Sequence, residues 1–281
     1  MKIKDKKIII ISASSDIGRA MCLSWQEKGA KIFGTYRTDS ISVRKLKNLG
    51  IKLFVCDLQY ESKIKKTCSN LKSACPKWDV LVLCPGTQEP IGPFTDTDFK
   101  AWENSIKVNF LSQLNIIHNL LPYRNKNNAF GPCVLFFAGG GTNNATLNYS
   151  AYTVSKIALI KMCELLDAEI KDTRFAIVGP GWVKTKIHKE TLKAKKRAGG
   201  NYKRVKDKFS SGAFTPMEDI LDCCEWLINS PRKVIGGRNF SVIFDMWGKK
   251  ELSNKLIADQ NMYKLRRCGN ELLIRKGNNN D

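Results

Sequence analysis

Short apolar runs alternate along this chain with longer segments whose apolar residues recur at helical spacing, and this alternation limits the folds open to it. The first run, 7–11, reads Lys-Ile-Ile-Ile-Ile and is typical of a strand buried on both faces. Repeated strand–helix–strand units predict an α/β fold with a doubly wound parallel sheet of about seven strands and helices on both faces. The other strands are predicted at 31–35, 51–55, 80–83, 133–137, 175–178 and 240–243.

Helical segments are predicted between these strands, with two long ones at 98–121 and 149–171. No linker divides the chain, so we expect one domain over residues 1–245. The segment 184–211 is an insertion within that domain. Residues 246–281 are an appended tail, and the end of the tail, 277–281, is expected to be disordered.

Composition narrows the class of protein further. The chain has 281 residues and a net charge of +21, from 47 Lys and Arg against 26 Asp and Glu. No apolar run approaches the roughly 20 residues of a membrane span, and the first run is too short for a secretory signal. Ten cysteines without CxxC or zinc-like spacing indicate reduced thiols and no metal site. We therefore expect a soluble cytoplasmic protein that does not bind membranes.

The positive charge is compatible with nucleic acid, an anionic membrane surface or an anionic substrate. No RNA-binding aromatic motif or zinc finger is present, so nucleic-acid binding is not expected as the main function. A Lys-rich coding habit would also raise the charge without any partner.

The first strand leads into a turn of small residues and then a helix, over 11–18. A helix N-terminus with free N–H groups binds phosphate, and ligands of such sheets lie beyond the carboxyl ends of the strands. The turn resembles the Thr-Gly-x-x-x-Gly-x-Gly turn of the short-chain dehydrogenase/reductase family. That resemblance implies a Rossmann-type, nicotinamide-binding domain, with the cofactor held here by Ser12, Ser14, Ser15, Ile17 and Gly18.

Two family glycines are replaced in this turn, by Ser12 and Asp16. Serine fits the first position if its φ is negative. The Asp16 carboxylate would repel a pyrophosphate unless it points outward or caps the helix.

The resemblance also implies which cofactor is used. The family's NAD-dependent members often carry an acidic residue where Tyr36 stands, and here Arg37 follows instead. Because arginine pairs bidentately with a phosphate, NADP(H) is favoured over NAD(H). Asp57 and Leu58 resemble the adenine-contacting positions, and Gly86 is retained from the family's Asn-Asn-Ala-Gly turn.

The chemistry is predicted on one helix, at Tyr152 and Lys156. Residues i and i+4 share a helical face, so the ammonium is expected beside the phenol, lowering its pKa from about 10. The phenol would then exchange a proton with a carbonyl oxygen, and the lysine would also bind the nicotinamide ribose. Asn109 resembles the family's catalytic asparagine, which holds a water that connects Lys156 to solvent.

The family's catalytic serine, about 13 residues before the tyrosine, is replaced. The segment 136–142 resembles the Ser-Gly-Gly-Gly version of some bacterial sugar-pathway members, with Ala138 in place of the serine. Thr142 is the candidate to fold back and supply the missing hydroxyl, and Tyr149 and Ser150 are the alternatives. Loss of one such donor typically costs about 10²–10³ in rate.

After the sixth strand, 179–185 resembles the family's Pro-Gly-x-x-x-Thr turn over the nicotinamide. Pro180, Gly181, Val183 and Thr185 are therefore cofactor-binding candidates, with Thr185 on the carboxamide. Eleven basic residues against two acids follow in 184–208, a net charge of +9. In this substrate lid they would attract an anionic substrate, a phosphate or nucleotide-sugar, or an acidic acyl carrier protein.

The sequence thus predicts an NADP(H)-dependent oxidoreductase interconverting a carbonyl and an alcohol, with a sugar or nucleotide-sugar of a surface-polysaccharide pathway as the first substrate class. A 3-oxoacyl-carrier-protein reductase and a catalytically weak nucleotide-binding homologue are the alternatives. The resemblance implies a homodimer or homotetramer assembled through 98–121 and 149–171. The tail segment 262–267 is expected over a neighbouring subunit or the substrate entrance.

Overall fold

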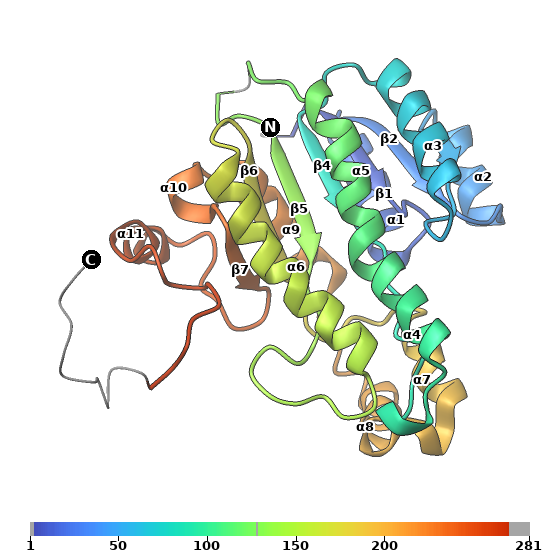
Figure 1. The fold of residues 1–281 in the computed structure, drawn as a ribbon. Coiled ribbons are helices and arrows are strands. Elements are labelled where there is room, and N and C mark those ends of the chain that lie inside the picture. The colour runs from blue at the N-terminus through green and yellow to red at the C-terminus, as the bar shows by residue number, and fades with distance from the viewer. Residues whose placement is uncertain (1–2, 128, 270–281) are drawn as a thin grey trace, which may run out of the picture.

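A seven-stranded parallel sheet runs through the middle of the protein, in the order β3-β2-β1-β4-β5-β6-β7 (Figure 1). The computed structural model describes residues 3–127 and 129–269. All six neighbouring pairs of strands are parallel, so their carboxyl ends share one edge of the sheet. The strands are β1 (Lys7–Ile11), β2 (Lys31–Tyr36), β3 (Lys52–Val55), β4 (Val80–Leu83), β5 (Cys133–Phe137), β6 (Arg174–Gly179) and β7 (Arg238–Ser241).

Helices cover both faces of the sheet (Figure 1). One face is packed by α1 (Asp16–Glu27), α2 (Ile41–Asn48), α9 (Met217–Ile228), α10 (Arg232–Ile235) and α11 (Lys250–Ala258). The other is packed by α3 (Glu61–Ala74), α5 (Ser112–Leu120) and α6 (Ser150–Glu169), with α4 (Phe99–Ile106) beside α6. The segment after β6 contains α7 (His188–Ala194) and α8 (Gly200–Ser211).

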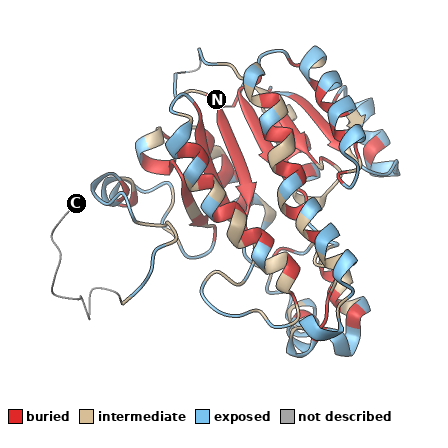
Figure 2. Cartoon of the chain, viewed as in Figure 1, coloured by how far each residue is buried: buried red, intermediate tan, exposed pale blue. Residues whose placement is uncertain are grey.

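The first strand shows why the sheet is central. Ile8 and Ile10 pack into the apolar core on the α1 side, while Ile9 and Ile11 pack into the core on the α6 side. All four are fully buried, and Figure 2 shows the central strands buried and the helices that cover them exposed along their outer faces. A strand with two buried faces needs continuous apolar residues, as the sequence indicated.

The predicted doubly wound sheet is confirmed, and its deviations are local. The last strand begins two residues earlier than the predicted 240–243. The predicted helix 98–121 is continuous in direction but contains a π-helical turn, Lys107–Leu111, between α4 and α5. The segment 184–211, expected as a loop, is mostly helical.

The tail segment 262–267 packs on its own chain, against β7 and α6. The backbone N–H of Asn239 in β7 donates to the Tyr263 carbonyl at 2.9 Å, and the Tyr263 ring meets Phe240 edge-on. Arg266 forms a bidentate pair with Glu164 of α6, at 2.7 and 3.1 Å. The predicted disorder of 277–281 lies outside the described residues. Within residues 3–127 and 129–269, no helix is long and apolar enough to span a bilayer.

Candidate active site

The candidate site lies where the loops after β1, β4, β5 and β6 meet the start of α6 and the segment 184–211. Because parallel strands end at one edge, residues from distant parts of the sequence converge there. Figure 1 shows α7 and α8 beyond this edge of the sheet, below the ends of α4 and α6. In the described part of the chain, no three His, Cys, Asp or Glu side chains are grouped as a metal site.

Lys156 is the central buried charge of the site. Its ammonium donates to the Phe137 carbonyl at 2.9 Å and to the Pro85 carbonyl at 3.5 Å, and the side chain is almost fully buried. It lies 5.7 Å from the ring centroid of Tyr152, one helical turn earlier on α6. No ion pair with a carboxylate involves Lys156 in the described residues, so a third N–H remains available for a ligand hydroxyl.

The electrostatics of the pair differ from the sequence expectation. Burial raises the pKa of Tyr152 to about 12, and the nearby Glu190 carboxylate adds to that rise. Burial also lowers the pKa of Lys156 to about 8. The proximity of the lysine therefore does not lower the phenol pKa here, because desolvation of both groups outweighs their interaction.

The buried lysine should make stability depend on pH. Its pKa is about 8 in the folded chain against 10.5 in the unfolded one, so folding is penalised below pH 8 and the penalty is relieved as pH rises. Relative to Lys156→Met, we expect the wild type to gain about 2 kcal/mol of unfolding free energy between pH 7 and pH 10. Urea unfolding without cofactor measures this difference.

The matched control is Lys161→Met, because Lys161 lies on the same helix but is half-exposed and pairs with Glu164. Its stability difference from the wild type should change little over that pH range. A Lys156→Met difference that is equally flat would contradict a buried, desolvated ammonium.

Gly139 is the residue that faces the phenol, and this corrects the placement of the missing serine at Ala138. A Cβ added to Gly139 would lie 2.6 Å from the Tyr152 hydroxyl oxygen and 2.7 Å from Cε1. Ala138 instead points into the apolar core beside β5. Counting 13 residues back from Tyr152 also gives Gly139. The Tyr152 ring thus occupies the space that a side chain at 139 would take.

The three candidate hydroxyls make no hydrogen bond to Tyr152 within the described residues. Thr142 is half-buried in the loop after β5, and among the described residues no hydrogen bond joins it to Tyr152. The Tyr149 hydroxyl is hydrogen-bonded to Thr191 of α7 at 2.7 Å. The Ser150 hydroxyl accepts from the Trp102 indole at 3.0 Å.

Asn109 lies in the π-helical turn and is fully buried. Its side-chain oxygen accepts from the Thr87 N–H at 3.0 Å, and its side-chain nitrogen donates to the Thr87 carbonyl at 2.9 Å and to Ser105. The Gln113 amide donates to the Asn109 carbonyl. These bonds fix the loop after β4, which contains Gly86 and the Pro85 carbonyl contacted by Lys156.

The first turn has the expected path but not the expected conformation. Ser12 has φ +61°, so the condition of a negative φ does not hold and the serine adopts a left-handed conformation that favours glycine. Gly18 is required by close approach, because an added Cβ would lie 2.6 Å from the Ser12 carbonyl oxygen. Ser15 caps α1 by accepting from the Gly18 N–H at 3.1 Å. The free N–H groups of this helix start remain suited to phosphate.

Asp16 neither caps the helix nor points into open solvent. Its carboxylate accepts from the backbone N–H of Lys186 at 2.7 Å, while the Lys186 ammonium donates to the Ser14 carbonyl at 2.9 Å. The two contacts connect the first turn to the base of the lid. They direct the Asp16 charge toward the lid and bring an ammonium to the turn, which relieves the expected repulsion of a pyrophosphate.

The remaining cofactor candidates lie along the same edge of the sheet. Arg37 is exposed just after β2, and no hydrogen bond or ion pair involves its side chain in residues 3–127 and 129–269. Asp57 follows β3 and caps the turn to Gln59, and Leu58 is buried beneath it. A Cβ added to Gly86 would lie 4.0 Å from the Lys156 ammonium nitrogen.

The Pro-Gly turn continues β6 at residues 180–185. Gly181 has φ +74°, and Val183 is buried in the core with its carbonyl bonded to the His188 ring at 2.9 Å. Pro180 and Thr185 are half-buried in the same segment. The candidates from this turn, the first turn and α6 therefore lie at the same edge of the sheet, whereas Arg37 and Asp57 lie toward its β2–β3 end.

Glu190 of α7 was not singled out from the sequence. Its carboxylate accepts from the Gln88 N–H at 2.5 Å and from the Thr87 hydroxyl at 3.2 Å. Burial raises its pKa. These bonds dock the lid on the loop after β4, next to Tyr152. The sequence feature that could have identified Glu190 is that it and Asp207 are the only acidic residues in the basic segment 184–208.

The residues at this edge of the sheet fit a nicotinamide dinucleotide. The N-terminus of α1 offers free N–H groups there, and the buried Lys156 ammonium of α6 has an available N–H. This combination of fold and Tyr–Lys pair defines a Rossmann-type oxidoreductase.

Comparisons with known proteins agree. A family model described as "Enoyl-(Acyl carrier protein) reductase" matches residues 11–242. The chain belongs to the short-chain dehydrogenase/reductase family of oxidoreductases.

Individual relatives are distant. The chain is 24% identical to the rat "Dehydrogenase/reductase SDR family member 6" over 239 residues, covering 84% of this chain and 95% of the relative. It is 28% identical to the 3-oxoacyl-[acyl-carrier-protein] reductase of Buchnera aphidicola over 202 residues, covering 67% and 78%.

Solved structures share the fold. A Saccharomyces cerevisiae short-chain dehydrogenase/reductase matches with a TM-score of 0.74 at 21% identity, covering 89% of this chain and 98% of the other. A Shigella flexneri short-chain dehydrogenase complexed with NADP matches with a TM-score of 0.70 at 18% identity, covering 85% and 98%.

Proposed function

We propose that this protein is an NADP(H)-dependent reductase that interconverts a carbonyl and an alcohol by hydride transfer. The observation that carries the proposal is the Tyr152 hydroxyl packed against Gly139, one helical turn from the buried Lys156 ammonium. When bound, NADP(H) supplies or accepts the hydride. The chain supplies the proton and the positions of both reactants.

In the reductive direction, the Tyr152 hydroxyl donates its proton to the substrate oxygen. A phenol with a pKa of about 12 is fully protonated at neutral pH and is therefore ready to donate. Lys156 holds the site through Phe137 and Pro85 and offers its remaining N–H to a ribose hydroxyl. Asn109 acts as a positioning residue, because it holds both peptide groups of Thr87.

The cofactor would be held by the first turn at Ser12, Ser14, Ser15, Ile17 and Gly18, by Gly86, and by the Pro-Gly turn at Pro180, Gly181, Val183 and Thr185. Asp57 and Leu58 would border the adenine. The test is NADPH oxidation, followed by absorbance, with a panel of aldose, ketose and nucleotide-sugar carbonyls. Saturable NADPH binding without hydride transfer to any carbonyl would favour a nucleotide-binding homologue with little activity.

Arg37 is proposed to select NADP(H) over NAD(H) through the 2′-phosphate. Its exposed guanidinium has no carboxylate partner in the described residues, and the Lys47 ammonium lies 3.0 Å from the hydroxyl of the neighbouring Tyr36. We expect Arg37→Ala to weaken NADPH binding about tenfold and leave NADH binding unchanged. Fluorescence titration with both cofactors measures the change.

The control is Arg44→Ala, because the Arg44 guanidinium is already paired with Asp39 at 3.0 Å. It should alter neither affinity. Equal weakening of NADPH and NADH by Arg37→Ala would mean that the arginine does not read the 2′-phosphate.

A second candidate function is reduction of a 3-oxoacyl group on an acyl carrier protein. The matching family model and the Buchnera relative favour it. The first candidate remains a sugar or nucleotide-sugar, which rests on the basic lid and the Gly-Gly-Gly segment after β5. Turnover of an acetoacetyl thioester, with no turnover of any carbonyl in the sugar panel, would favour the carrier-protein substrate.

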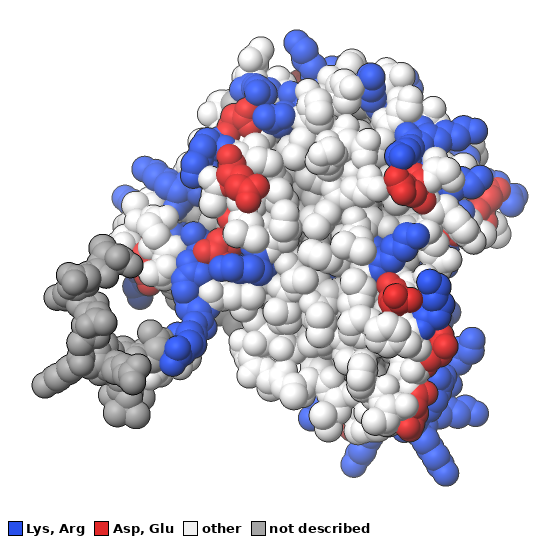
Figure 3. Space-filling view, viewed as in Figure 1, with Lys and Arg blue, Asp and Glu red and all other residues white. Residues whose placement is uncertain are grey.

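We also propose a homodimer or homotetramer formed through the long helices. Figure 3 shows a broad face over α5 and α6 with few charged side chains. Exposed apolar residues on this side include Leu111, Val154 and Leu165. Sedimentation of the purified chain tests this assembly.

A further inference from the structure

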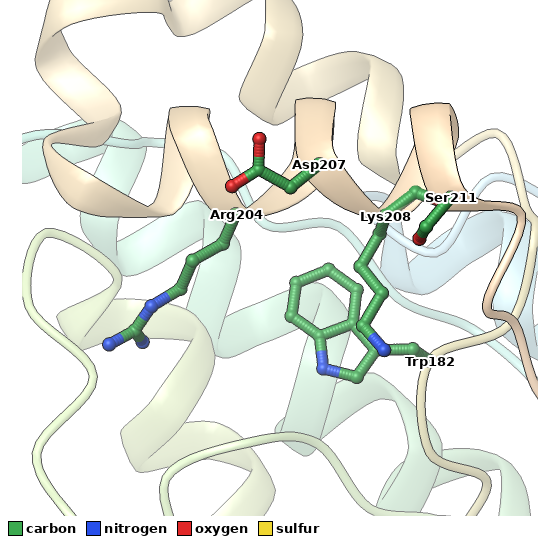
Figure 4. A pocket seen from close by; sticks show the side chains of 5 residues that line it. All are labelled: Trp182, Arg204, Asp207, Lys208 and Ser211. Carbon is green, nitrogen blue, oxygen red and sulfur yellow. The ribbon is translucent and has the colours of Figure 1, made fainter.

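A hollow of about 480 Å³ opens between the Pro-Gly turn and α8 (Figure 4). Its floor is the Trp182 indole, directly after Gly181. Its roof is one face of α8, because positions i, i+3, i+4 and i+7 of a helix point the same way. These four positions are Arg204, Asp207, Lys208 and Ser211.

The floor is held rigidly from below. The Trp182 ring stacks on the His188 ring with centroids 5.3 Å apart and planes 14° apart. His188 in turn packs against Phe209 and Phe214, and its Nε2 is bonded to the Val183 carbonyl. An indole fixed on one side and open on the other is a ready stacking surface for a planar ring or a sugar.

Among the described residues, the two cations of the roof have no carboxylate partner. No hydrogen bond or ion pair involves the Arg204 side chain in the described residues, and Lys208 uses its ammonium only to donate to the Ala213 carbonyl at 3.1 Å. Figure 4 shows the indole beneath α8, between these two side chains. Two cations that form no ion pair in the described part of the chain, beside an aromatic floor, suit an anionic group attached to a ring.

The remaining lining groups refine the ligand class. The Asp207 carboxylate and the Ser211 hydroxyl can accept hydrogen bonds from sugar hydroxyls. A carboxylate in the roof disfavours an acidic protein helix, because like charges repel.

The hollow adjoins α7, and the same helix docks on the loop next to the reacting groups. The helix that carries His188 beneath Trp182 carries Glu190 two residues later, and Glu190 docks on the loop beside Tyr152.

We propose that this hollow binds the nucleoside diphosphate portion of the substrate. The base or ribose stacks on Trp182, the diphosphate pairs with Arg204 and Lys208, and the ribose hydroxyls are bonded by Asp207 and Ser211. This inference rests on the proposed reductase, since it assigns a substrate class to that reductase.

The test is a binding measurement that needs no turnover. Uridine diphosphate is titrated by calorimetry into the full chain saturated with NADPH. We expect the Arg204→Gln/Lys208→Gln double variant to bind it at least tenfold more weakly than the wild type. The matched control is Lys203→Gln/Lys206→Gln, which removes the same charge from α8 at positions outside the hollow and should stay within about twofold.

Equal weakening in both double variants would show non-specific attraction to a basic helix and overturn the proposal. So would unchanged binding in Arg204→Gln/Lys208→Gln, or no binding to the wild type while holo acyl carrier protein binds. If uridine diphosphate binds as expected but no carbonyl is reduced, the subsite stands and the reductase proposal fails.

Discussion

Tyr152→Phe should lower the rate of carbonyl reduction by a factor of about 10²–10⁴, while the protein still folds and binds NADPH. The substitution deletes only the hydroxyl oxygen, which lies against Gly139. The ring remains to pack beside Lys156, so the fold and the buried ammonium keep their neighbours. The loss should appear in kcat, measured by NADPH oxidation, with the NADPH dissociation constant unchanged.

Tyr149→Phe is the matched control, one helical turn away in the same segment. Its hydroxyl bonds Thr191 of the lid, so its removal should change the Michaelis constant for the carbonyl substrate more than kcat. If the two variants lose kcat equally, the proton donor is not Tyr152 alone. If Tyr152→Phe retains full activity, proton donation comes from another group.

The sheet could be predicted from the sequence because its signal is local. Runs such as 80–83 and 133–137 are continuous apolar strands, and the structure places them at those residues. The seventh strand was displaced by two residues. It is an edge strand, and the tail packs along its outer side. It also contains Arg238, a buried charged residue that the apolar pattern of a strand does not predict.

The site was harder to predict because its contacts are long-range. Asp16 and Lys186 are 170 residues apart, and nothing near either residue indicates that they meet. Motif spacing placed Tyr152 and Lys156 on one helix, but it could not show that both become desolvated. That environment reverses the expected direction of the phenol pKa.

The lid shows the same limit of sequence reasoning. Its charge count of +9 indicated an anion, but not which side chains face the site. The structure turns the acidic Glu190 toward the loop after β4, while Arg204 and Lys208 line the hollow at Trp182. Only the packing of α7 and α8 shows which lid residues dock on the loop after β4 and which are free to bind a ligand.

Gly139→Ala should lower kcat/KM about 100-fold by displacing the phenol. A Cβ cannot remain 2.6 Å from the Tyr152 hydroxyl oxygen, so the ring must move away from β5. A shift of about 1 Å in a reacting group costs on the order of 10² in rate. The measurement is carbonyl reduction at saturating NADPH, with a crystal structure of the variant to locate the ring.

Gly140→Ala is the control, because no atom lies within 4 Å of the Cβ that it would add. The two variants add the same methyl group to adjacent residues of one loop, so loop stiffening affects both alike. Only the contact with Tyr152 distinguishes them. Equal activities would mean that the phenol reaches its working position without using the space at Gly139. The hydroxyl that donates the proton would then have to be sought on the lid.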